Sequence, residues 1–347
     1  MDMIGYLGNA LLYRTQNVGE LHRRVYAEVR TWPNAKALMG DSGHEEQDAS
    51  RKARAEHPEY FAEFLPCFAI RPAYNTLLFL LSPLGLTKAA ILISVLSYFF
   101  IGWLLLAWTH RPLLSLLVLL TPPLVSLGRS PVSDAFALLL AFSALVLIFE
   151  KELFLPGLIL LLGALFARTD YIFLAAPVLV ALWWLGEVNW WQAAVLSLLA
   201  VLVVLSINHF AGDYGVQMLY YRNFVRQPIA PAEITVHFSW QQYWAAFRSG
   251  MMNLMNSAFL PFSILGIIGF RGNRVLPIVA LVYAALHYLA LPNFQERWFV
   301  ISYLLWAVSA FTALPGKQPQ PSVWLQSGSG QRRWTGLPAR ETPVRAE

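Results

Sequence analysis

Long apolar runs separated by short polar turns dominate the chain from about residue 73 to residue 314. A helix needs roughly 17 to 25 apolar residues to cross a hydrocarbon core about 30 Å thick, because each residue adds about 1.5 Å. Runs near this length, some of them shorter and dependent on polar flanks, lie at residues 89–109, 112–128, 132–149, 153–167, 171–185, 192–211, 252–270, 275–291 and 298–314. The segment 73–86 is short for a full span and contains Pro83 and Gly85. It is a candidate for a partial or tilted tenth span. The pattern predicts an all-α, polytopic integral membrane protein with about nine to ten transmembrane helices.

Residues 1–72 have a different composition. They hold half of the chain's 20 acidic residues and no run apolar enough to span a membrane. Residues 21–32 and 44–56 are typical of amphipathic helices. Phe61, Phe64 and Phe68 then recur at helical spacing, as expected for a segment lying at a membrane surface. We therefore expect a hydrophilic loop with short helices on the outer face, and not a separate domain.

Overall composition agrees with a membrane protein and excludes other classes. The 347 residues are 57% hydrophobic and 13% charged, well beyond an ordinary globular chain. A single cysteine, Cys67, excludes an intramolecular disulfide and argues against a cysteine-based metal site. The net charge of +5 is explained by basic loops that meet lipid headgroups, so a nucleic-acid partner is not expected. Residues 315–347 are rich in Pro, Gly, Ser and Gln and are predicted to form a disordered cytoplasmic tail.

The charges in the turns indicate an orientation. If the segment before residue 89 is outside, the inside turns hold mostly lone bases, such as Arg111, Lys151 and Arg271. The outside turns then hold mixed acid and base pairs and a long loop at 212–250. Lone bases orient a membrane protein more strongly than mixed pairs, which favours this arrangement. An exported N-terminal loop needs a signal peptide or a first span, so we expect either an unusual N-terminus or an upstream transmembrane helix absent from this sequence.

Charged residues at the ends of the central apolar runs are candidates for a site. Charge inside a membrane is costly, so Asp134, Arg168 and Asp170 are expected to line a site at one membrane face. Two plainer interpretations stay open. Asp134 could cap its helix, beside Ser133. Arg168 could simply extend its guanidinium to lipid headgroups.

Several short motifs resemble one known family. In the middle of the chain they are Ser133-Asp134, Glu150-Lys151-Glu152, Gly157 with Gly163, Arg168-Thr169 and Pro177. Elsewhere they are Asp2 with Tyr6 and Ala10, Arg71-Pro72-Ala73-Tyr74, and Glu296-Arg297-Trp298-Phe299. Together they resemble the GT-C superfamily, the multispan glycosyltransferases that use polyprenyl-phosphate-linked sugars. The chain departs from the family pattern at its start, where the first span is absent and Asp2 lies at the very edge.

The resemblance implies a function and roles for particular residues. It implies transfer of a sugar from a polyprenyl-phosphate donor to a lipid or glycan acceptor, on the outer side of the cell (inner) membrane. Asp2 would be the general base, or would orient the acceptor, with Asp134 as a second catalytic acid. The residues expected to bind the substrate and its phosphate are Arg71, Arg129, Arg168, Asp170, Glu296 and Arg297. Some family members use a divalent metal, and this sequence shows no metal motif, so we leave a metal open.

Several of these features also have plainer interpretations. Asp2 could be a solvated acid, and Glu296 with Arg297 could be a local ion pair. His209, His237 and His287 show no ligand spacing and are predicted to be interfacial side chains. The aromatic residues of the 212–250 loop could stack on a sugar, although an interfacial helix is the favoured interpretation. Alternative functions are a polysaccharide polymerase, a lipid or glycan flippase and a non-catalytic membrane scaffold.

Overall fold

The structure, a computed structural model, describes residues 2–43, 45–213, 221, 238–292 and 294–315. All regular secondary structure within these residues is helical. The N-terminal helices are α1 (Asp2–Leu12), α2 (Val18–Val29), α3 (Ala35–Leu38), α4 (Glu45–Glu56), α5 (Pro58–Phe64), α6 (Pro66–Ala69), α7 (Pro72–Leu80) and the 3₁₀ helix η1 (Ser82–Leu84). The remaining helices are α8 (Leu86–Thr109), α9 (Pro112–Leu119), α10 (Pro122–Arg129), α11 (Ser133–Phe149), α12 (Phe154–Ala167), η2 (Thr169–Tyr171), α13 (Ile172–Trp184), α14 (Trp190–Phe210), α16 (Trp240–Met255), α17 (Phe259–Gly269), α18 (Val275–Ala290) and α19 (Glu296–Ala313).

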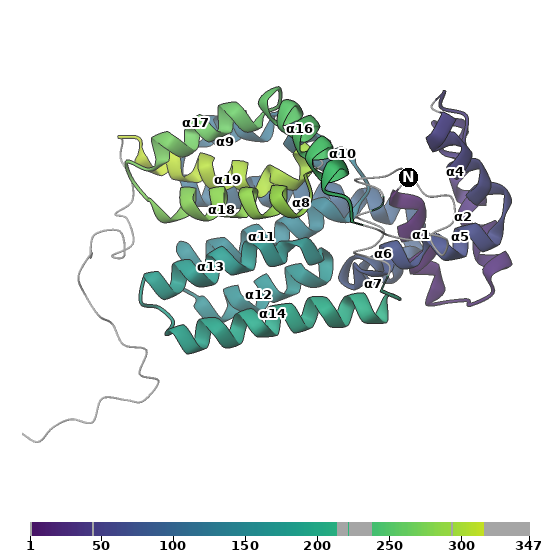
Figure 1. The fold of residues 1–347 in the computed structure, drawn as a ribbon, viewed down its shortest axis with the longest axis horizontal. Coiled ribbons are helices and arrows are strands. Elements are labelled where there is room, and N and C mark those ends of the chain that lie inside the picture. The colour runs from purple at the N-terminus through teal and green to yellow at the C-terminus, as the bar shows by residue number, and fades with distance from the viewer. Residues whose placement is uncertain (1, 44, 214–220, 222–237, 293, 316–347) are drawn as a thin grey trace, which may run out of the picture.

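The apolar helices lie side by side along the long axis of the molecule (Figure 1). Each of the nine apolar runs in the sequence falls within helices of this bundle. Among the described residues, α8 and α14 are long and apolar enough to cross a membrane, and the bent pairs α9–α10 and α16–α17 would raise that number from 2 to 4. Helices α11, α12, α13 and α18 are apolar but shorter. The described residues are therefore all-helical in their regular structure and contain 2 to 4 helices or helix pairs able to cross a membrane.

The segment proposed as an additional span does not form one continuous helix. Helix α7 has 9 residues and is followed by the 3₁₀ helix η1, with Gly85 at a φ of 93° between η1 and α8. Nine residues of helix rise only about 14 Å, roughly half of a hydrocarbon core. Proline at position 83 and glycine at position 85 account for this, because both favour the end of a helix. The segment 73–86 therefore does not cross a membrane as a single helix.

Helix α19 is at the centre of the bundle. Its residues from Trp298 to Phe311 are all buried. It packs closely on α17 because Gly266 and Gly269 present no side chain there, and a Cβ at Gly266 would lie 2.6 Å from Trp306. In the same way, Gly157 lets α12 approach α11. Small residues are a common means of close helix packing where lipid supplies no hydrophobic driving force between helices.

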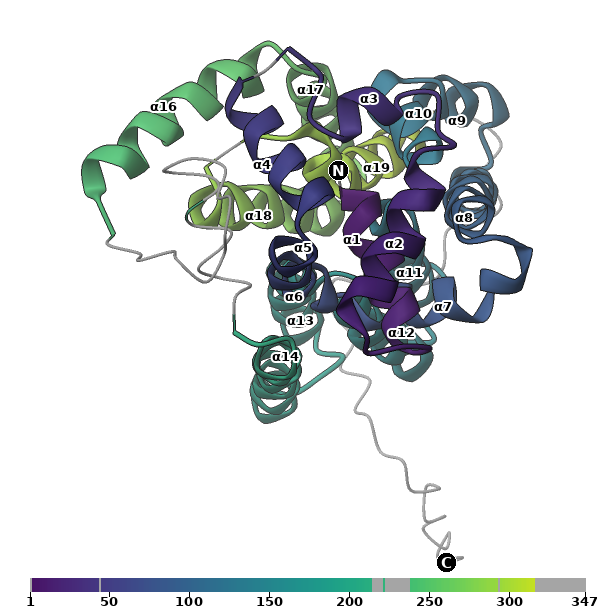
Figure 2. The ribbon, with the colours of Figure 1, turned by 90° about the vertical axis from the view of Figure 1, so that its right-hand side faces the viewer.

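Helices α1 to α6 cover one end of the bundle (Figures 1 and 2). The predicted amphipathic helices are confirmed as α2 and α4. The prediction that Phe61, Phe64 and Phe68 lie at a membrane surface is wrong, because all three are buried in a core shared with α1, α7 and the start of α8. Residues 1–72 are thus mostly helical, and their core is continuous with the first helices that follow.

Antiparallel alternation of the helices brings two different sets of turns to opposite ends of the bundle. At one end the starts of α11 and α19 meet the ends of α12 and α18, beneath the N-terminal helices. At the other end of the bundle, the C-terminal ends of α8 and α19 lie near the start of α18. Arg111 donates there to the carbonyl oxygen of Leu314 at 3.0 Å.

Candidate functional site

A continuous chain of charged and polar side chains lies where the N-terminal helices meet the bundle. Every adjacent pair in it is joined by a hydrogen bond or an ion pair. We call it the polar chain, and in order its members are His287, Asp170, Arg168, Asp134, Arg297 and Asp2. These residues come from α18, η2, α12–η2, α11, α19 and α1, segments that are far apart in the sequence.

Arg168 is the central cation of the polar chain. Its Nε donates to Asp170 Oδ1 at 2.9 Å, and its Nη2 donates to the other oxygen of the same carboxylate. Its Nη1 donates to Asp134 Oδ1 at 2.7 Å. Burial would raise the pKa of Asp170, but the guanidinium and the ring of His287 beside it hold that pKa well below its usual range. Arg168 is only 5% exposed, so it organises two carboxylates and is closed to a ligand in this conformation.

The sequence left open whether Asp134 caps its helix and whether Arg168 extends to headgroups. The N-cap position of α11 has no side-chain hydrogen bond, and both oxygens of Asp134 accept from arginines instead. The capping interpretation is therefore wrong. The headgroup interpretation of Arg168 is wrong for the same reason, since its donors face Asp134 and Asp170.

Arg297 and Asp2 form the open end of the polar chain. Arg297 Nη1 donates to Asp134 Oδ2 at 3.1 Å and to Asp2 Oδ2 at 3.2 Å. The side chain of Arg297 is 31% exposed and that of Asp2 is 15% exposed. A cation and a carboxylate that solvent can reach thus stand side by side, where a substrate could contact both.

His287 forms the closed end of the polar chain. The ring is fully buried, and its Nε2 lies 3.0 Å from Asp170 Oδ2. Its Nδ1 is buried and has no hydrogen-bond partner among the described residues. The prediction that His287 is an interfacial side chain is wrong. A histidine on the buried face of an apolar helix gives no local signal of its partner, which is 117 residues away in the sequence.

Tyr6 and Arg71 adjoin the polar chain from the N-terminal side. The Tyr6 hydroxyl lies 3.0 Å from Ser133 Oγ, next to Asp134, and Arg71 donates to the same hydroxyl. The Arg71 guanidinium also lies 5.3 Å from the centre of the Tyr6 ring. Burial raises the pKa of Tyr6 to about 12, so the hydroxyl stays protonated. Arg71 is half-buried, which gives this end of the site a second cation within reach of a ligand.

Besides Arg71, two predicted site residues lie outside the polar chain. Glu296 does not pair with Arg297 and instead accepts from the backbone N–H of Ala258 at 2.7 Å, at the start of α17. Arg129 is exposed at the end of α10, and its side chain makes no hydrogen bond or ion pair within the part of the chain that the structure describes. The local-pair interpretation of Glu296 and Arg297 is therefore wrong. Within the described residues, no group of three or more His, Cys, Asp and Glu is arranged to hold a metal ion.

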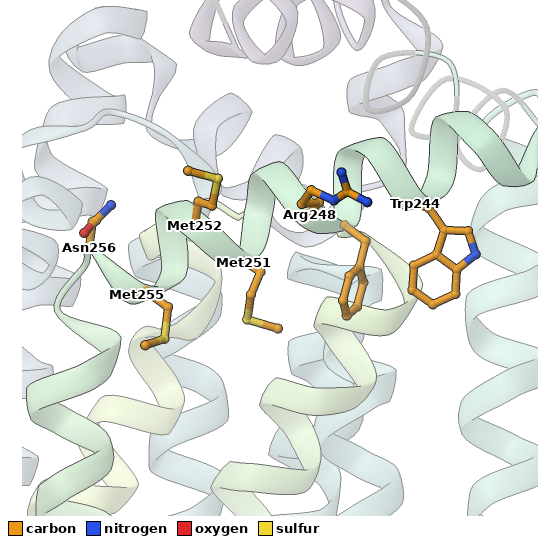
Figure 3. A pocket seen from close by; sticks show the side chains of 7 residues that line it. Trp244, Arg248, Met251, Met252, Met255 and Asn256 are labelled. Atoms are coloured by element: carbon orange, nitrogen blue, oxygen red, sulfur yellow. The ribbon is translucent and has the colours of Figure 1, made fainter.

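A separate pocket of about 540 Å³ lies along the exposed side of α16. Figure 3 shows Trp244, Met251 and Met255 on one side of this helix, and the guanidinium of Arg248 and Met252 on the other. Helix α16 is bent by 72° from α17 and extends outward at the side of the bundle (Figure 2). The favoured interfacial helix thus matches a helix for residues 240–250, while most of 212–237, including His237, lies outside the described residues.

Comparison with known proteins identifies no relative. No protein-family model matches the chain, and no curated protein and no solved structure matches it either.

Proposed function

We propose that this chain is an integral membrane glycosyltransferase of the GT-C type. It transfers a sugar from a polyprenyl-phosphate donor to a lipid or glycan acceptor at the outer face of the cell membrane. The observation that carries this proposal is the polar chain, in which Asp2, Asp134, Arg168 and Arg297 of the resembling motifs lie together at one end of an apolar helix bundle. A donor with a membrane-embedded tail and a charged headgroup needs a charged site at that depth.

Asp2 is the general base in this proposal. Its carboxylate accepts the proton of the acceptor hydroxyl while the hydroxyl oxygen attacks the anomeric carbon of the sugar. The bond between that carbon and the phosphate oxygen breaks, and polyprenyl phosphate leaves. Asp134 has both oxygens engaged by arginines, so it fixes Arg297 and does not itself accept the proton.

Arg297 and Arg71 bind the leaving phosphate. They are the cations at this site that solvent reaches, and a guanidinium suits bidentate binding of phosphate oxygens. Arg168 holds Asp134 and Asp170 in place from the interior. Its role is therefore to position the acids, and not to bind phosphate directly.

The membrane topology in this proposal uses nine spans. They are α8, the pair α9–α10, α11, α12, α13, α14, the pair α16–α17, α18 and α19. The shorter helices reach across with their polar flanks and with local thinning of the bilayer, which costs only fractions of a kcal/mol per Å. The N-terminal helices and the polar chain then share the outer face, and the turns with Arg111, Lys151 and Arg271 face the cytoplasm.

The test uses the purified chain in proteoliposomes with radiolabelled polyprenyl-phosphate sugars and extracted lipid and glycan acceptors. Transfer is expected for the wild type and is expected to fall by at least about 100-fold in Asp2→Asn, because a positioned base contributes about that much. Asp41→Asn, at an exposed acid in the N-terminal part, is the matched control and should keep full activity. Absence of transfer from every donor, or equal activity of Asp2→Asn and wild type, would refute the proposal.

A further inference from the structure

A second polar site lies at the end of the bundle opposite the polar chain. It is a cavity of about 100 Å³, and because a water molecule takes about 30 Å³ of liquid, it has the volume of about three water molecules. Its described lining comes from residues at or next to the ends of α8, α11, α13 and α19 and the starts of α12 and α18. It includes three aromatic and three acidic side chains. The aromatic residues are Trp108, Phe149 and Phe154, and the acidic residues are Glu150, Glu152 and Glu187.

Glu187 is the acid that points to a ligand. It is only 7% exposed, yet its side chain makes no hydrogen bond or ion pair within the described residues. Burial, and then the nearby charge of Glu152, raise the pKa of Glu187, as expected where negative charge is not neutralised. A buried carboxylate without a partner is costly, so a cation that enters the cavity would remove that cost.

The lining offers no cation of its own. No Lys, Arg or His is among the described residues that line the cavity. Lys151 pairs with Glu150 at 3.6 Å, but its side chain is half-exposed and is not part of the lining. Glu152 and Glu187 therefore lack a basic neighbour in the described lining, and the net charge there is negative.

The aromatic residues that line the cavity indicate which kind of cation would bind there. A metal ion needs several carboxylate or imidazole ligands converging on one point, and no such group occurs among the described residues. Alkylammonium groups instead bind between aromatic faces, which carry negative charge at the ring centre, with carboxylates nearby. We propose that this cavity binds an alkylammonium group, such as the head of choline or of a choline or ethanolamine lipid.

The first experiment measures binding of soluble choline to the chain purified in maltoside detergent, by calorimetry and by Trp fluorescence. Its neutral isostere, 3,3-dimethyl-1-butanol, has the same shape without the charge. Choline is expected to bind and the isostere is not. Glu187→Gln should weaken choline binding by about tenfold or more, while Glu45→Gln, at an exposed acid of α4, should leave it unchanged.

The second experiment distinguishes a lipid headgroup from a free compound. Wild type and Glu187→Gln are melted in nanodiscs of phosphatidylcholine or of phosphatidylglycerol. A lipid ligand should raise the melting temperature of the wild type in phosphatidylcholine, and the gain should be absent in Glu187→Gln. Choline binding alone identifies a soluble ligand, and a phosphatidylcholine-specific gain alone identifies a headgroup. Absence of both, or either one retained in Glu187→Gln, would overturn the proposal whatever the enzyme assay gives.

Discussion

Arg297 Nη1 lies 3.2 Å from Asp2 Oδ2, although 295 residues separate the two in the sequence. The contact joins the first turn of α1 to the first turn of α19, the most buried helix of the bundle. The N-terminal helices are therefore attached to the bundle by charge as well as by the core around Tyr74 and Leu78. It also places a carboxylate and a guanidinium at the one end of the polar chain that solvent reaches.

Arg71→Gln is expected to raise the KM for the donor by about tenfold and to change kcat little. The reason is that Arg71 contacts Tyr6 and not Asp2, so its loss weakens phosphate binding without moving the base. Steady-state kinetics with a range of donor concentrations measures both constants. Arg129→Gln is the matched control, since Arg129 is exposed at the end of α10 and bonds neither to Tyr6 nor to the polar chain. An equal rise in KM in both variants would place the phosphate elsewhere.

Arg168→Met is expected to destabilise the protein by about 3 to 5 kcal/mol, because it removes the guanidinium that pairs with Asp170 and one of the two arginines that pair with the buried Asp134. Thermal unfolding in detergent, followed by circular dichroism, measures the loss. The triple variant Asp134→Asn, Arg168→Met and Asp170→Asn should recover most of the stability, since it removes the unpaired charges as well. A single variant as stable as the wild type would show that these ion pairs do not hold α11 to the turn between α12 and α13.

Two substitutions of His287 test whether the hydrogen bond from its Nε2 to Asp170 stabilises the protein. Glutamine can place its amide nitrogen near that of His287 Nε2 and keep the hydrogen bond to Asp170, whereas asparagine is too short. His287→Gln should therefore stay within about 1 kcal/mol of the wild type, and His287→Asn should lose about 1 to 3 kcal/mol, the cost of a buried group left unsatisfied. The melting temperatures of the two variants are compared directly. Equal losses would show that the ring fills space and does not anchor Asp170.

Much of the fold follows from the sequence because apolar periodicity is local. Seven of the nine runs each correspond to one helix within a few residues, as do the predicted α2 and α4, whereas 112–128 and 252–270 each cover parts of a bent pair. Phe61, Phe64 and Phe68 were misplaced, since spacing identifies an apolar face but not what covers it, and here α1 does. The number of spans is not determined by the pattern either. Several helices are shorter than a full membrane span, and two pairs are bent.

In the candidate site too, some residues could be predicted from the sequence and others could not. Charge at the end of an apolar run is informative in one sequence, so Asp134, Arg168 and Asp170 stand out, and all three lie in the polar chain. His287 does not stand out, because its partner comes from another helix and no local rule pairs the two. Nor could the sequence indicate that Arg168 is closed to solvent while Arg297 is open, since exposure depends on how the N-terminal helices cover the bundle end.

Gly157→Ala tests whether the close contact of α11 and α12 holds the polar chain in position. A Cβ at Gly157 would lie 2.5 Å from Ile148 Cγ1 and 3.0 Å from the carbonyl oxygen of Ala144, and the backbone cannot yield cheaply. We expect a loss of about 1 to 3 kcal/mol in thermal unfolding. Gly163→Ala, on the same helix, meets nothing within 4 Å and should be neutral or stabilising by up to about 1 kcal/mol, as alanine favours a helix. If Gly157→Ala also lowers transfer more than Gly163→Ala does, the displacement has reached Arg168 at the far end of α12. Equal stability of the two variants would mean that the helices are not packed as closely as described.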